Sequence, residues 1–124
     1  MMSKAQINLI QRTIDLLSLP DEKRPDAGCL DIHVTDALRC LGRLPKGAGA
    51  LPFTQCMNTA MMAFGEKLIS LNLTLGAGWK ALMTHKERRH FTEGYGATIP
   101  LALCITGLNQ ALNIAKTRSK EIKA

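Results

Sequence analysis

Aromatic side chains are scarce in this chain of 124 residues, at 4% of the sequence, although hydrophobic residues make up 46%. A core must therefore consist mainly of Leu, Ile, Met and Ala. That mixture favours helices over strands, because strands prefer β-branched and aromatic side chains. Charged residues make up 21% of the chain, and this balance excludes a disordered protein. We expect a single domain spanning residues 1–124.

Long apolar runs and closely spaced cysteines are also lacking. The longest apolar run, Ala97–Leu108, is shorter than the roughly 20 residues that cross a bilayer, so no membrane span is expected. The first fifteen residues are too polar for a secretion signal. The four cysteines, which form no tight pair, are Cys29, Cys40, Cys56 and Cys104. These features predict free thiols in a cytoplasmic protein.

Acidic residues are few as well. Ten Asp and Glu stand against sixteen Lys and Arg, which gives a net charge of +6. A positive surface raises the association rate with anionic partners, but it does not choose between nucleic acid, acidic protein and anionic lipid.

The first helix is predicted from its cap and its apolar face. Ser3 and Gln6 have the spacing of a capping box, in which each side chain binds the backbone amide of the other residue. Apolar residues then recur at helical spacing at Ile7, Ile10, Ile14 and Leu17. Pro20 ends this helix, and a charged loop over 21–28 follows. A shorter helix is expected over Val34–Leu41, before a Gly- and Pro-containing loop over Gly42–Pro52.

Three further helices are predicted in the second half of the chain. The third, capped by Thr54, has an apolar seam with spacings of four and three at Met57, Met61, Phe64, Leu68, Leu71 and Leu75. A fourth helix is expected from about Gly78 to His90. A fifth begins near Thr98, with Pro100 in its first turn, and the basic tail over 116–124 is expected to fray. Since no long stretch alternates as a strand does, the sequence predicts an all-α fold, a small four- or five-helix bundle.

Catalytic and metal-binding groupings are weak. Cys29 and His33 form one loose pair, whereas a structural zinc site usually has two close pairs. Glu87 and His90 have the spacing that di-iron bundles use twice, but no second pair is present. Asp31 and Asp36 could orient His33, although acids near a helix start more simply serve as caps or dipole partners. We therefore expect no cofactor, no metal and no enzymatic activity.

The densest positive charge lies between residues 80 and 90. The residues predicted to bind a partner are Lys80, His85, Lys86, Arg88, Arg89 and His90. Trp79, Phe91 and Tyr95 flank them, and cations with aromatics suit a phosphate backbone with stacked bases. A simpler explanation also stays open, because cations near a helix C-terminus are favoured by the helix dipole alone. Trp79 is predicted to belong to the core.

These observations lead to three functional hypotheses. The first is a non-enzymatic interaction or regulatory protein that uses a cationic helical surface to bind an acidic protein or nucleoprotein partner. The second is direct, largely non-specific nucleic-acid binding. The third is a small thiol- or His-dependent enzyme. The apolar width of the third and fifth predicted helices indicates either a homodimer or two helices that bury each other.

Overall fold

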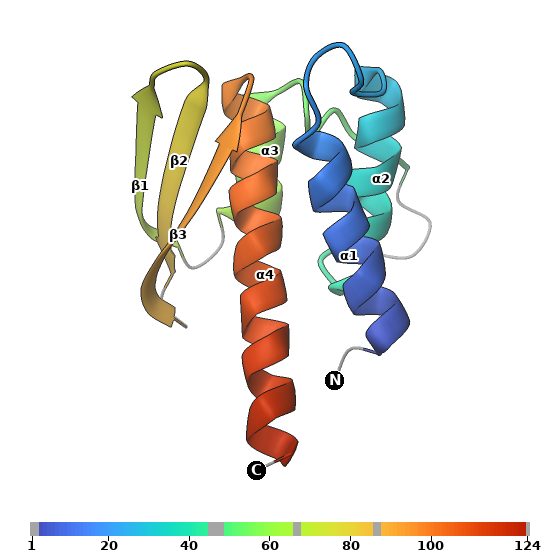
Figure 1. The fold of residues 1–124 in the computed structure, drawn as a ribbon, viewed down its shortest axis with the longest axis vertical. Coiled ribbons are helices and arrows are strands. Elements are labelled where there is room, and N and C mark those ends of the chain that lie inside the picture. Colours follow the sequence, from blue (N-terminus) through green and yellow to red (C-terminus); the bar gives the residue numbers. More distant parts are fainter. Residues whose placement is uncertain (1–2, 45–48, 66–67, 86–87, 124) are drawn as a thin grey trace.

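A computed structural model describes residues 3–44, 49–65, 68–85 and 88–123. Its helices and strands, in chain order, are α1 (Lys4–Leu17), α2 (Ala27–Cys40), α3 (Met57–Phe64), β1 (Leu68–Leu75), β2 (Trp79–His85), β3 (Arg88–Gly96) and α4 (Ile99–Lys123). The strands form an antiparallel sheet in the order β1-β2-β3 (Figure 1). The predicted all-α helical bundle is therefore wrong: the fold combines helices with a sheet.

The predicted third helix is in fact a helix followed by a strand. Its first part forms α3, which ends at Phe64 with Gly65 as the C-cap, and its second part forms β1. The run Leu71–Leu75 satisfies both patterns, because its leucines continue the spacing of four and three while also alternating with Asn72 and Thr74. This segment forms a strand because pairing with β2 supplies partners for its backbone hydrogen bonds, and the alternation places its leucines on the inner face.

The predicted fourth helix, Gly78–His90, is also wrong, because this segment forms β2 and the start of β3. The short segment between Leu75 and Trp79 is a hairpin turn, in which the Gly76 N–H donates to the Gly78 carbonyl at 2.8 Å. Trp79, Ala81 and Met83 share the face of β2 that is turned to the core, where Ala81 and Met83 are fully buried. Short alternating runs joined by glycines therefore produced a hairpin rather than a helix.

The first and last predicted helices are confirmed. In α1 the capping box is present, with the Ser3 hydroxyl accepting from the Gln6 N–H at 3.2 Å. Helix α4 begins at Ile99, where the Thr98 hydroxyl accepts from the Leu101 N–H at 3.3 Å, and it continues to Lys123. Helix α2 begins seven residues before the predicted start at Val34.

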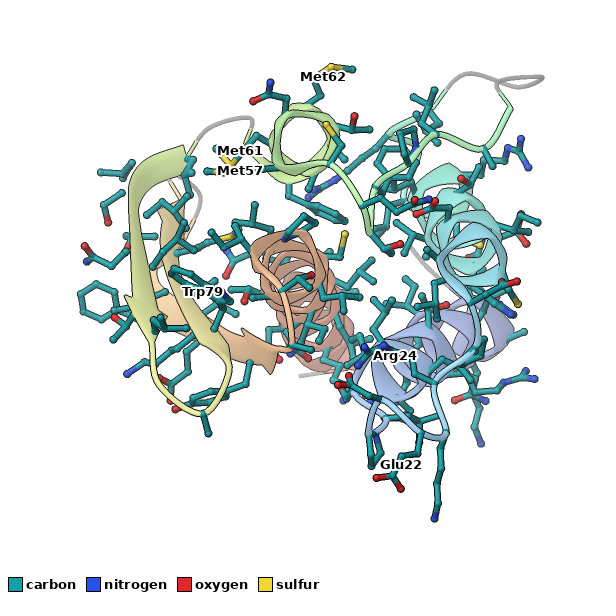
Figure 2. All side chains as sticks on the ribbon, turned by 90° about the horizontal axis from the view of Figure 1, so that it is seen from above. Glu22, Arg24, Met57, Met61, Met62 and Trp79 are labelled. Carbon is teal, nitrogen blue, oxygen red and sulfur yellow. The ribbon has the colours of Figure 1, made fainter. Side chains whose placement is uncertain are left out.

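Helix α4 lies at the centre of the molecule. It contacts β2 and β3 on one side and α1 and α3 on the others, and Figure 2 shows this arrangement from above. Every residue from Leu101 to Leu108 is buried. The first half of this helix, which the sequence predicts to be apolar on nearly all sides, is therefore covered by the sheet and the neighbouring helices of the same chain.

Strand β3 and α4 approach each other closely because β3 presents small residues to the helix. A Cβ added at Gly94 would lie 2.5 Å from Thr106 Oγ1, and one added at Gly96 would lie 2.5 Å from the Ala102 nitrogen. Both glycines are strand positions whose missing side chains let the helix backbone come near.

Candidate functional site

The predicted partner-binding residues that the structure describes lie on the paired strands β2 and β3 rather than on a helix. His85, the last residue of β2, pairs with Arg88, the first residue of β3. Arg89 and His90 follow in β3, and Lys86 lies outside the described residues. The prediction of a cationic helical surface is therefore wrong for this segment, although its positive residues do gather at one end of a hairpin.

Lys80 does not belong to this gathering. It lies five residues before His85 in β2, which corresponds to about 16 Å along an extended strand. Its cross-strand neighbour is Tyr95, and its Nζ lies 3.5 Å from Glu93 Oε2. The charge of Lys80 is therefore balanced locally on the outer face of the sheet.

The end of the β2–β3 hairpin lies level with the C-terminal part of α4. Along the two antiparallel elements, Gly96 adjoins Ala102 and Gly94 adjoins Thr106. The Thr92 hydroxyl then donates to Gln110 Oε1. Each two residues back along β3 thus correspond to four residues forward along α4. The two advances are similar, at about 6.7 Å on the strand and about 6 Å on the helix, so the same correspondence holds further along. Continued further, it brings residues 88–90 level with residues 114–118 along the α4 axis, at the lower end of the molecule in Figure 1.

Most of the net charge of the chain is concentrated at this end. Residues 88–90 and 116–123 contain six Lys and Arg and one Glu, a net of +5, whereas the whole chain carries +6. Lys86 and Glu87 cancel in formal charge. We call the six basic residues the cationic end; they are Arg88, Arg89, Lys116, Arg118, Lys120 and Lys123. The sequence shows both basic segments, but their position at one end follows only from the packing of β3 on α4.

Two exposed aromatic residues lie on the outer face of β3: Phe91 next to the cationic end, and Tyr95 at the other end of the strand, opposite Lys80. Thr92 and Gly94 of β3 face the core, so the alternate residues Phe91 and Tyr95 face outward. Phe91 is 68% exposed and Tyr95 is 62% exposed. Trp79, in contrast, packs against the core, as predicted from the sequence.

Asp31, which the sequence suggests as a residue that could orient His33, has a structural role. Buried Asp31 accepts hydrogen bonds from the Thr54 N–H at 2.8 Å, from the Thr54 hydroxyl at 2.7 Å and from Gln55 Nε2 at 2.7 Å. These bonds join α2 to the segment that precedes α3. Among the described residues, no group of three or more His, Cys, Asp or Glu could hold a metal ion.

The cysteines differ in their surroundings. Burial, and then the negative charge of Asp31, raise the pKa of the Cys104 thiol, which donates to the Phe53 carbonyl at 3.3 Å. The side chain and backbone N–H of Thr59, followed by the backbone N–H of Asn58, lower the pKa of the Cys56 thiol. Cys29 and Cys40 are half-buried.

A second polar feature lies where the α1–α2 loop passes close to the start of α4. Two adjoining cavities of about 430 and 240 Å³ share Asp21 and Arg24. Arg24 points inward while Glu22 points away (Figure 2). The Arg24 guanidinium lies 2.5 Å from Asp21 Oδ1 and donates to the Leu19 carbonyl at 3.2 Å. Since Asp21 balances its charge, Arg24 holds the loop together and does not make an anion site.

No helix in the described part of the chain is long and apolar enough to cross a membrane. No protein-family model matches this chain, and neither does any curated protein or any solved structure.

Proposed function

We propose that this chain is a non-enzymatic binding protein that holds an acidic protein or nucleoprotein assembly at its cationic end. The observation that supports the proposal is the segregation of charge, since +5 of the net +6 lies in residues 88–90 and 116–123. Opposite charge on a partner steers its approach and selects against partners of like charge. The proposal includes a cytoplasmic location, where four free cysteines stay reduced.

The basic residues come from two elements, and this favours a broad partner surface. Strand β3 contributes Arg88 and Arg89, and α4 contributes basic residues from Lys116 onward. Lys116 is exposed. A single small anion would occupy only part of such a surface, whereas an acidic protein surface or a phosphate-rich assembly would match its extent.

Charge reversal tests the proposal. The variant Arg88→Glu/Lys116→Glu reverses one charge on each element. The control Arg12→Glu/Lys23→Glu makes the same change in net charge at exposed positions of α1 and of the loop after it. Each protein is used to capture partners from native lysate, with and without nuclease, and circular dichroism confirms the fold. We expect a defined partner to bind the wild type and the control, and to bind the reversal variant at least roughly tenfold less. Equal capture by both variants would refute the proposal.

Direct binding of single-stranded nucleic acid is a second candidate, favoured by the exposed ring of Phe91 beside the cationic end. Bases stack on such rings with about 1–3 kcal/mol each, while nearby cations contact the phosphates. In this case Phe91→Ala should weaken binding of a labelled oligonucleotide by roughly tenfold. Affinity should also fall by about 0.7 logarithmic units per contacted phosphate for each decade of salt. A response that does not depend on salt removes this candidate.

A further inference from the structure

We propose that β1 is a dimerisation edge, which pairs antiparallel with β1 of a second copy of this chain to make a continuous six-stranded sheet. This inference goes beyond the proposed function and does not depend on it.

The first observation is that β1 is an uncovered edge of the sheet. Its only strand partner among the described residues is β2, and Figure 1 shows no other element on its far side. Backbone N–H and C=O groups of alternate residues therefore point away from the sheet, where they can pair with another strand.

The second observation is that β1 carries neither charge nor proline, two of the features that normally block edge pairing. Edge strands are usually protected by charged residues, proline, short length or bulges. The eight residues Leu68–Leu75 include no charged residue and no proline. The one irregularity lies between Leu68 and Ser70, so the strand from Ser70 to Leu75 is regular. In contrast, β3 at the other edge carries Arg88, Arg89 and Glu93.

The third observation is that β1 is complementary to itself. Leu71 and Leu73 share the inner face with Met83 and Ala81 of β2, whereas Ser70, Asn72 and Thr74 lie on the outer face. A twofold axis at Asn72 would pair Leu71 with Leu73 of the second copy, and Ser70 with Thr74. Apolar residues then meet apolar residues, and polar residues meet polar ones, as an isologous interface requires.

This register also suits the exposed apolar residues at the two ends of the strand. Ile69, in the irregular start of the strand, is 59% exposed and Leu75 is 65% exposed, and the twofold axis places Leu75 of each copy beside the start of the other copy's strand. Exposed apolar side chains on an edge strand favour burial by a partner.

Together with this self-complementary register, the lack of charge on β1 favours a second copy as the occupant. An acidic partner would find no cation on β1, whereas two uncharged β1 strands meet without repulsion even though each chain carries +6. Antiparallel pairing also points the two copies in opposite directions. Their cationic ends then lie at opposite ends of the dimer, far from each other.

The substitution Asn72→Lys tests this arrangement, because it puts two like charges opposite each other across the twofold axis, with Cβ atoms about 5 Å apart. Asn72 lies on the exposed outer face, so the monomer keeps its fold. Asn8→Lys, at an exposed position of α1, is the matched control. Sedimentation equilibrium should give a dimer for the wild type and for the control. The dimer dissociation constant of Asn72→Lys should rise at least roughly tenfold.

A mixing experiment separates a broken interface from a damaged monomer. Asn72→Glu alone should weaken the dimer as Asn72→Lys does, whereas an equimolar mixture of Asn72→Lys and Asn72→Glu should restore it, since opposite charges then meet. A monomeric wild type, an unchanged dimer in Asn72→Lys, or a mixture that stays monomeric would each overturn the proposal. Partner capture by the cationic end is measured separately, so a failure to dimerise does not decide the proposed function.

Discussion

The carboxylate of Asp31 joins two segments that are far apart in the sequence. It accepts three hydrogen bonds from Thr54 and Gln55, while it is itself buried in α2. Removing the carboxylate leaves the N–H and hydroxyl of Thr54 without these bonds in a buried position, and a buried polar group without a partner costs more than the bond contributed.

Asp31→Ala is therefore expected to lower the free energy of unfolding by about 3 kcal/mol, as measured by urea denaturation at pH 7. Asp36→Ala is the control, since Asp36 lies in the same helix and forms a surface ion pair with Arg39 at 3.3 Å. Its loss should be under about 1 kcal/mol. Equal losses in the two variants would show that the Asp31 hydrogen bonds do not stabilise the fold.

For single residues, the sequence indicates the positive charge of the candidate site but not which basic residues belong to it. The concentration of Arg88 and Arg89 is visible in the sequence, whereas the separation of Lys80 is not. On a helix Lys80 would have stood one turn and a half from His85, but on a strand it lies far away and beside Glu93. Which basic residues lie together depends on whether the segment is a helix or a strand, so the wrongly predicted helix included Lys80 in the site.

At the scale of elements, the contact between β3 and α4 depends on glycine. A methyl group at Gly94 would lie 2.5 Å from Thr106 Oγ1 and 3.0 Å from Ile105 Cγ2, so Gly94→Ala must push the helix away from the strand. We expect it to destabilise the protein by about 2 kcal/mol in thermal or urea unfolding. At Gly49 an added Cβ meets nothing within 4 Å, so Gly49→Ala should have little effect. Similar stabilities for the two variants would contradict this packing.

Helices that carry their own signals could be predicted, and strands that depend on distant partners could not. Helix α1 has a capping box between Ser3 and Gln6 at its start and a regular apolar face along its fourteen residues. In β3, Gly94 and Gly96 occupy inward positions but contribute no hydrophobicity, so the alternation is invisible in the sequence. The position of Arg88 and Arg89 near the end of α4 follows from that same unseen strand.

At the scale of the whole molecule, the buried thiol of Cys104 is expected to lower the free energy of unfolding as the pH rises into the alkaline range. Burial raises the pKa of its thiol, whereas in the unfolded chain the thiol ionises near its ordinary pKa of 9.0. Below that pH the thiol is protonated in both states and has no effect on the pH dependence. Above it, only the unfolded chain loses the proton, so stability falls as pH rises, by up to about 1.4 kcal/mol per pH unit.

Cys104→Ala removes this contribution. The substitution also loses packing at every pH, so the comparison uses slopes rather than absolute values. We expect the unfolding free energies of the wild type and the variant to differ by a constant amount from pH 7 to about 8.5 and to converge above it. Parallel curves up to pH 10.5 would show that the native state lets the thiol ionise freely.

The central position of α4 has a further consequence, which concerns time. This helix contacts α1, α3, β2 and β3, and all of them precede it in the chain. During synthesis these elements emerge first, with the apolar faces that α4 covers still open to water. The core can close only after residues 101–112 have left the ribosome, so the apolar faces of the earlier elements stay open to water, or are shielded by a chaperone, until α4 has emerged.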